Sequence, residues 1–236
     1  MNARGRPCTA GFSPQGFFAQ VPPGRVQDEL RDCFARWGLP TAVQFDNGNP
    51  WGSCGDLPTP LASWLIGAGL HVIWIPVGTP QDNGVVERGQ GVVWNWAEPD
   101  RCGSVGELQR RMEEEDRVQR ELYPHAGFAS RMAAYPGLAH SGRRYSRSWE
   151  RSHWSWEAVL AHLAGRQVTR RVDCSGKIGL YDGKLYVGAV NRGKEVVVQF
   201  DAGAAEWVVS DRGGVELCRR PLTQFDAAGL CRLPVD

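Results

Sequence analysis

The feature that most constrains the fold of this chain is a change of hydrophobic period near residue 165. Between Val26 and Trp37, apolar residues fall at i, i+4, i+7, i+8 and i+11, which is one stripe of an amphipathic helix. From Gln167 onward, short β-rich runs alternate with turns that contain Gly, Asp and Asn. The sequence therefore predicts a mixed α/β architecture first and an all-β architecture second.

Helices and strands alternate in the first part of the sequence. After the helix over 26–37, residues 41–47 predict a short strand, and Thr59 followed by Pro60 predicts the start of a second helix that ends at Gly69. The apolar run 71–76 has the length of a buried strand. Further helices are predicted over 85–98 and over 104–123, the latter opened by a Ser104–Glu107 capping box. This alternation is typical of an α/β layer with a partly parallel sheet.

The β-rich part contains six short runs in about 70 residues, a spacing typical of a small closed or nearly closed barrel. The runs are QVTRRVD, KIGLYD, KLYVGAV, KEVVVQFD, EWVVSD and VELCRR. Between the two parts, residues 124–150 have no hydrophobic period and predict a linker or an extended arm, and 154–165 predict a short helix. We therefore expect three regions, 1–137, 138–164 and 165–236.

Composition excludes several classes of protein. The net charge of +1 and the 42% of hydrophobic residues are those of a globular chain. Seven cysteines without a Cys-x-x-Cys pair indicate neither a disulfide framework nor a zinc knuckle, so a reducing compartment is expected. Residues 1–25 lack an apolar stretch of signal-peptide length, and no run approaches the roughly 20 residues that cross a bilayer. These observations predict a cytoplasmic protein without a membrane partner.

Two acidic residues follow similar turn sequences. Asp46 ends the apolar strand in VQFDNGNPWG, and Glu87 stands just after the next strand in PQDNGVVERGQG. If the two strands are neighbours, both carboxylates reach the same end of the sheet, where they could bind a hard cation such as Mg²⁺. The residues alone leave two alternatives open. Asp46 also suits an ordinary surface turn, and Glu87 also suits the first turn of a helix.

The order of these pieces resembles the catalytic core of DDE-type integrases and transposases, the retroviral-integrase superfamily. The resemblance begins in the helix before RWGLPTAVQFDNG and extends through PQDNGVVERGQG, roughly residues 26–97. YPGLAHSGRRYS is similar to the segment that follows the core in bacterial insertion-sequence transposases, and the β-rich end resembles the small barrel of integrases. The resemblance implies an RNase H-like α/β core, incomplete at its first strands, followed by an SH3-like barrel.

In that family three acids hold a pair of Mg²⁺ or Mn²⁺ ions, and Asp46 and Glu87 match the second and the third. Forty residues separate them here, against about 35 in the family, and the extra length is expected in the loop GSCGDLPTP, where insertion costs little. The first acid should precede the helix over 26–37, yet residues 1–25 contain no Asp or Glu. Acids at 28, 29 and 32 fall within the helix itself.

The missing acid leads to further expectations. A site without one carboxylate should lose orders of magnitude of activity, and a sheet without its first strand should leave Phe34 and Trp37 exposed. We therefore expect either a degenerate, N-terminally truncated copy or a start assigned inside a longer gene. The resemblance implies DNA integration or transposition by Mg²⁺-dependent polynucleotidyl transfer, in a homo-oligomer. Its alternative is an inactive remnant that retains at most DNA binding.

Positive charge is placed late in the chain, as a DNA partner would require. Residues 1–137 hold 12 Arg against 15 Asp and Glu, whereas 138–156 carry a net charge of +3. In SGRRYSRSWERSHWSW, arginines alternate with aromatic residues, a mixture suited to a DNA backbone. A linker whose aromatic residues dock on the core would look the same. The residues predicted to contact transposon ends and target DNA are Arg143, Arg144, Arg147, Arg151, Arg170, Arg171 and Lys177.

Overall fold

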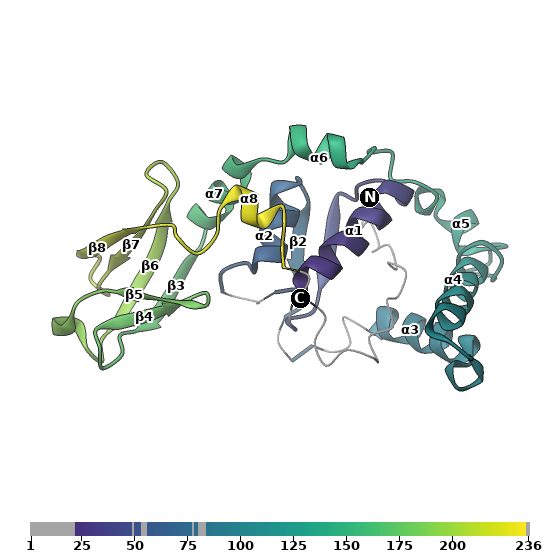
Figure 1. Ribbon diagram of the computed structural model, residues 1–236, viewed down its shortest axis with the longest axis horizontal. Coiled ribbons are helices and arrows are strands. Elements are labelled where there is room, and N and C mark those ends of the chain that lie inside the picture. Colours follow the sequence, from purple (N-terminus) through teal and green to yellow (C-terminus); the bar gives the residue numbers. More distant parts are fainter. Residues whose placement is uncertain (1–21, 49, 53–55, 77, 80–83, 235–236) are drawn as a thin grey trace. The chain divides into compact units, whose positions relative to one another are not determined.

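A computed structural model describes residues 22–48, 50–52, 56–76, 78–79 and 84–234 of the chain (Figure 1). The chain divides into two compact units. Unit 1 comprises Met1–Asp46, Ile75–Ser152 and Pro234–Asp236, and unit 2 comprises Asn47–Trp74 and His153–Leu233. The boundaries expected from the sequence, after residues 137 and 164, stay predictions.

Unit 1 is mainly helical where the structure describes it. Its elements are α1 (Pro23–Trp37), β1 (Ala42–Phe45), α3 (Gly84–Ala97), η3 (Pro99–Arg101), α4 (Val105–Glu121), α5 (Arg131–Ala134), η4 (Pro136–Leu138) and α6 (Arg147–His153). The helices α3 and α4 pack through a small core in which Leu108 and Met112 meet Ala97. Ser104 caps α4 as the sequence predicts, because its Oγ accepts the Glu107 N–H at 3.2 Å.

One expectation about unit 1 is wrong, because Phe34 on α1 is buried rather than exposed. The Tyr145 ring covers it in an edge-to-face contact, with ring centroids 5.6 Å apart. Trp37 is half-buried, and the guanidinium groups of Arg36 and Arg120 lie 4.7 and 5.3 Å from its ring centroid. The apolar face of α1 is therefore covered by residues that the sequence placed outside the core.

The helix α6 was not predicted, because residues 124–150 show no hydrophobic period. Local hydrogen bonds explain why it forms. The Ser146 Oγ accepts the Trp149 N–H at 3.0 Å, and the Ser146 carbonyl accepts the Glu150 N–H at 2.9 Å. A serine in this position satisfies donors that the first turn of a helix otherwise leaves unpaired. The expected extended arm therefore ends in two turns of helix.

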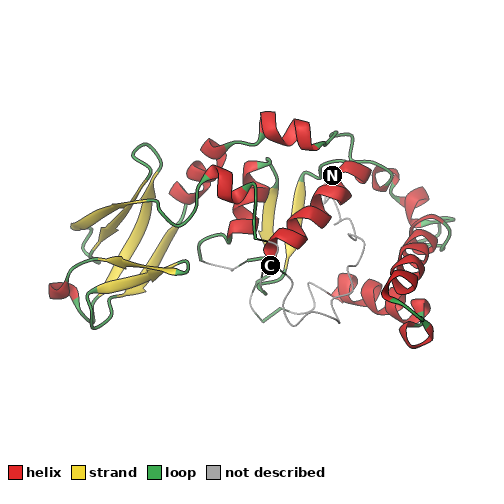
Figure 2. Cartoon of the chain, viewed as in Figure 1, coloured by secondary structure: helices red, strands yellow, loops and turns green. Residues whose placement is uncertain are grey.

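Unit 2 contains the β-rich end of the chain (Figure 2). Its helices are α2 (Pro60–Gly67), α7 (Trp156–Ala164), η5 (Ala189–Asn191) and α8 (Ala227–Leu230). Its strands are β2 (His71–Trp74), β3 (Gln167–Arg171), β4 (Lys177–Leu180), β5 (Gly183–Tyr186), β6 (Glu195–Asp201), β7 (Glu206–Ser210) and β8 (Glu216–Pro221). Each of the six predicted β-rich runs therefore contains a strand.

The strands β3, β6, β7 and β8 form an antiparallel sheet in the order β3-β6-β7-β8, and β4 pairs with β5 as a hairpin. Alternate residues of β6 point into the core, where Val198 stands opposite both Val168 and Val209. Phe200 and Trp207 pair across β6 and β7 with ring centroids 4.8 Å apart. This mixed α/β content and the four-stranded sheet are observed, while an RNase H-like core and an SH3-like barrel stay predictions.

Residues 56–74 pack with the β-rich part of unit 2. Leu57 belongs to the same hydrophobic core as the sheet. The Trp154 Nε1–H donates to the Trp64 carbonyl of α2 at 2.9 Å, and the Ser155 N–H donates to the Gly67 carbonyl at 2.8 Å. Leu57 thus shares its core with the sheet, and α2, predicted as a layer of the α/β core, is hydrogen-bonded to Trp154 and Ser155, directly before α7. Across both units, none of the helices in the described ranges is long and apolar enough to cross a membrane.

The turn between β3 and β4 packs against the backbone at Ala189, and a substitution at Gly176 tests this contact. Gly176 has φ +74°, and a Cβ built on it would lie 2.7 Å from the Ala189 backbone N. We expect Gly176→Ala to lower the free energy of unfolding by about 2 kcal/mol or more, through strain and overlap. Gly179→Ala is the matched control, because its Cβ would meet open space, and we expect a change within about 0.5 kcal/mol. Urea titration of both variants measures this, and equal effects would contradict the turn geometry.

Candidate functional site

Asp46 directly follows β1, as the sequence predicts, and its side chain is exposed. The Phe45 carbonyl, at the end of β1, accepts the Ile75 N–H at 2.9 Å. The residue that follows β2 therefore lies beside the residue that precedes Asp46. This hydrogen bond brings the start of the stretch that leads to Glu87 next to Phe45, which directly precedes Asp46. The metal-site hypothesis requires the two strands to be neighbours in this way.

Glu87 lies in the first turn of α3 and is exposed. Residues 80–83, which form the first four positions of PQDNG, lie outside the described residues. Helical spacing places Gly91 and Trp94 on the same side of α3 as Glu87, at i+4 and i+7, and Trp94 is 40% exposed. Val93 and Ala97, on another side, face the core shared with α4. The acid therefore stands at one end of an accessible helix face.

The chemistry of the donor set fits a divalent ion. Two exposed carboxylates supply the oxygen ligands that Mg²⁺ takes from a protein, because water and phosphate oxygens usually complete its octahedron. In the described ranges, no group of three or more His, Cys, Asp or Glu side chains is placed to hold a metal ion. A metal site formed by Asp46 and Glu87 therefore stays a prediction, and the pair of ions stays an implication of the resemblance.

The four arginines predicted to bind DNA near α6 fall into two kinds. Arg143 donates to the Pro40 carbonyl at 2.8 Å, and Arg147 forms an ion pair with Asp28 at 3.0 Å. Arg144 and Arg151 are exposed, and neither side chain makes a hydrogen bond or ion pair with any residue that the structure describes. Two of the four side chains are therefore available to an anionic ligand as they stand.

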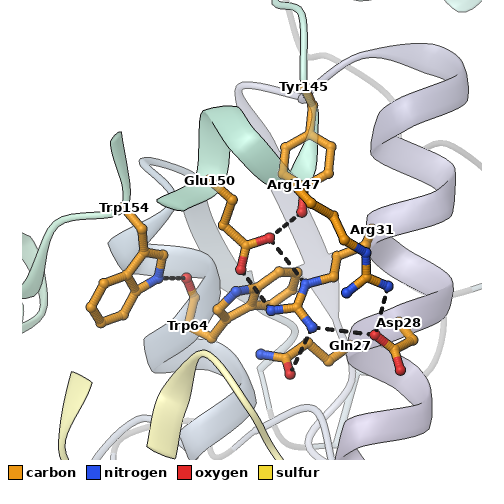
Figure 3. A network of polar contacts seen from close by, with 8 residues as sticks. All are labelled: Gln27, Asp28, Arg31, Trp64, Tyr145, Arg147, Glu150 and Trp154. Carbon is orange, nitrogen blue, oxygen red and sulfur yellow. Dashed lines mark hydrogen bonds and ion pairs between the residues drawn. The ribbon is translucent and has the colours of Figure 1, made fainter. Parts of the chain in front are cut away.

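A buried network connects this basic segment to α1 (Figure 3). Arg31 donates from Nε and Nη2 to the two carboxylate oxygens of Glu150, at 3.0 and 2.6 Å. The Tyr145 hydroxyl donates to the same carboxylate. Arg31 also donates from Nη1 to Gln27 at 3.3 Å and to Asp28 at 3.2 Å. Bidentate pairing of this kind combines two parallel charge-assisted bonds and fixes the orientation of both groups.

The network shifts the pKa values of its members. Burial raises the pKa of the Tyr145 hydroxyl well above its usual range, and the nearby Glu150 carboxylate raises it further. Burial also opposes the charged form of Asp28, but hydrogen bonds from Arg147 and Arg31 outweigh it and lower the pKa of that carboxyl. Tyr145 therefore stays protonated and can donate to Glu150 across the physiological range.

The basic residues predicted in unit 2 also differ in their surroundings. Arg170 forms an ion pair with Asp56 and donates to the Gly179 carbonyl at 3.1 Å, so its charge is engaged. Arg171 and Lys177 are exposed. Arg171 lines an open hollow of about 650 Å³ together with Arg192. Arg192 stands in an Asn-Arg-Gly turn and was not among the basic residues predicted to contact DNA, although its positive charge is visible in the sequence.

No protein-family model matches the chain.

The ion pairs of Asp28 predict a pH dependence of stability. Because the folded state lowers the pKa of Asp28, this carboxylate stabilises the fold above its ordinary pKa, and the contribution disappears as pH falls through the lowered value. The wild type should therefore exceed Asp28→Asn in urea midpoint at pH 7, by a margin that shrinks below about pH 4. Asp32→Asn, an exposed acid of the same helix, is the control. A margin that stays constant down to pH 2 would contradict the assignment.

Proposed function

We propose that this protein is a polynucleotidyl transferase of the DDE integrase and transposase type, which cuts and joins DNA strands. The observation that carries the proposal is the hydrogen bond between Phe45 and Ile75. It joins the segment that leads to Glu87 to the end of the strand that leads to Asp46. The motif spacing of the family supports the same two residues, and both side chains are accessible to DNA.

Asp46 and Glu87 are the residues that would hold Mg²⁺ or Mn²⁺. The bound ion would neutralise charge on the reacting phosphate and activate a water or a 3′-hydroxyl as nucleophile. The chain's own residues have other tasks in this proposal. Arginines near α6 hold the sugar–phosphate backbone, and the exposed face of α3 that carries Gly91 and Trp94 allows a DNA strand to approach Glu87.

Calorimetric titration with Mn²⁺ tests the metal ligands directly. Asp46→Asn and Glu87→Gln each remove one anionic oxygen ligand, so each should weaken Mn²⁺ binding by roughly tenfold or more. Glu113→Gln is the matched control, because Glu113 is an exposed acid of α4 in the same unit, and it should titrate like the wild type. Equal affinities for all four proteins would remove the metal site from the proposal.

A second candidate function is DNA binding without strand cleavage. It is favoured by the donor set, since the family site uses three acids and the matching stretch of this chain, roughly residues 26–97, supplies two, Asp46 and Glu87. A two-metal reaction that lacks one of its ligands should be slowed by orders of magnitude. The two candidates share the basic segment and differ only in chemistry.

Nicking of a supercoiled plasmid in the presence of Mn²⁺ separates the two candidates. The transferase proposal expects nicked product from the wild type and a loss of at least about a hundredfold in Asp46→Asn, because a transition-state ligand is removed. If the wild type and Asp46→Asn both bind DNA in a gel-shift assay and neither gives nicked product, the second candidate function is established instead. Nicking that Asp46→Asn leaves unchanged would indicate a contaminating nuclease and contradict the transferase assignment.

A further inference from the structure

The basic arm, defined here as residues 143–151, is held on α1 by side chains that are removed from water. The side chains of Arg31 and Glu150, which form the bidentate pair, are 9% and 6% exposed. Tyr145 is buried and donates to the same carboxylate from the other end of the arm. The arm is therefore attached to α1 at two points, through the Glu150–Arg31 pair and through the Tyr145 ring, which packs against Phe34 of α1 (Figure 3).

Each attachment point stands next to an arginine that is open to a ligand. Arg144 directly precedes Tyr145, and Arg151 directly follows Glu150. Both arginines are exposed and lack a polar partner among the residues described in the structure. The backbone that carries these two charges is thus the part of the arm that the network holds most firmly.

We propose that Arg31, Glu150 and Tyr145 are positioning residues for nucleic-acid binding, which hold Arg144 and Arg151 in place as a pair of DNA phosphate contacts. This inference rests on the proposed DNA binding. An arginine whose backbone is already fixed loses less conformational freedom when it binds. A guanidinium held at the correct angle can also bond two phosphate oxygens at once.

The kind of interaction supports positioning over simple stabilisation. A buried ion pair stabilises a fold little more than apolar residues of the same volume, because desolvation offsets the attraction. Its bidentate geometry, however, fixes direction, which an apolar contact does not. The phenol of Tyr145 adds a third bond to Glu150. The network therefore defines where the arm lies more strictly than hydrophobic packing would.

The first measurement identifies the phosphate contacts. Fluorescence anisotropy with a labelled duplex of about 20 base pairs, repeated at several salt concentrations, gives the slope of log K against log salt. Arg144→Ala and Arg151→Ala should each reduce that slope by about 0.9, the value for one lost phosphate contact. Arg110→Ala is the matched control, because Arg110 is an exposed arginine of α4 in the same unit, and its slope should equal that of the wild type.

The second measurement tests the positioning residues. Tyr145→Phe and Glu150→Gln should keep the salt slope, since both arginines remain, but should raise the Kd about tenfold through lost preorganisation. Electrostatics alone predicts the opposite for Glu150→Gln, because removing a negative charge favours DNA binding. Amide hydrogen exchange of residues 144–151 without DNA should be faster in both variants. Tyr135→Phe, which removes a phenol hydroxyl outside the network, is the control.

The outcomes separate this inference from the function on which it rests. A wild-type protein that binds no duplex DNA overturns the proposed function and the inference with it. If the arginine variants lose affinity while Tyr145→Phe and Glu150→Gln bind like the wild type, only the positioning role is overturned. Circular dichroism checks that Glu150→Gln folds. If it does not fold, Tyr145→Phe decides, because it preserves both charges of the buried pair.

A double-mutant cycle gives the most direct evidence. If Tyr145 positions Arg151, then Arg151→Ala should cost less affinity in the Tyr145→Phe background than in the wild type, because the arginine is already displaced. Tyr145 and Arg151 are six positions apart, and Glu150, which accepts the Tyr145 hydroxyl and directly precedes Arg151, provides a path for a coupling between them. Strictly additive effects would overturn the positioning role, even if each single variant binds DNA more weakly.

Discussion

The path of the arm in unit 1 is constrained by an ion pair between residues 119 positions apart, Arg31 and Glu150. Removing two such charges from water costs several kcal/mol for each ion, and only a fully bonded arrangement offsets that cost. Here Tyr145, Gln27 and Asp28 supply the additional hydrogen bonds. The Gln27 and Asp28 bonds lie within α1 and the Tyr145 bond lies within the arm, so the Arg31–Glu150 pair itself joins the two, and it forms only when the arm lies along α1. The same requirement therefore determines the path of the arm and brings the Tyr145 ring over Phe34.

The sequence predicts well those parts of the structure whose causes are local. Thr59 and Ser104 each cap a helix by accepting an N–H from a residue three positions later, so a short sequence window contains the whole interaction. The alternation of apolar and polar residues within a β-rich run likewise identifies a strand such as β6 without knowledge of its partner strands. Both kinds of signal are complete within about ten residues, and the corresponding elements are found where they were expected.

What the sequence could not provide is the identity of distant partners. Arg147 and Arg170 were assigned to DNA because of their charge, yet each pairs with an acid more than a hundred positions away, Asp28 and Asp56. A positive charge is visible in the sequence, whereas the group that neutralises it is not. The same limit applies to Phe34, whose burial depends on a residue of the arm. Only the three-dimensional arrangement distinguishes engaged arginines from those open to a ligand.

The distribution of residues between the two units bears on the proposed chemistry. Asp46 and Glu87 belong to unit 1, as do Arg144 and Arg151, whereas Arg171 belongs to unit 2. Phosphoryl transfer requires the reacting phosphate to be held at a fixed place, because a misplacement of about 1 Å can cost a hundredfold in rate. Residues of one packed unit can meet that requirement by themselves. In the proposed transferase, the arm arginines would therefore affect the rate of strand cleavage as well as affinity, whereas the basic residues of unit 2 would contribute mainly to affinity.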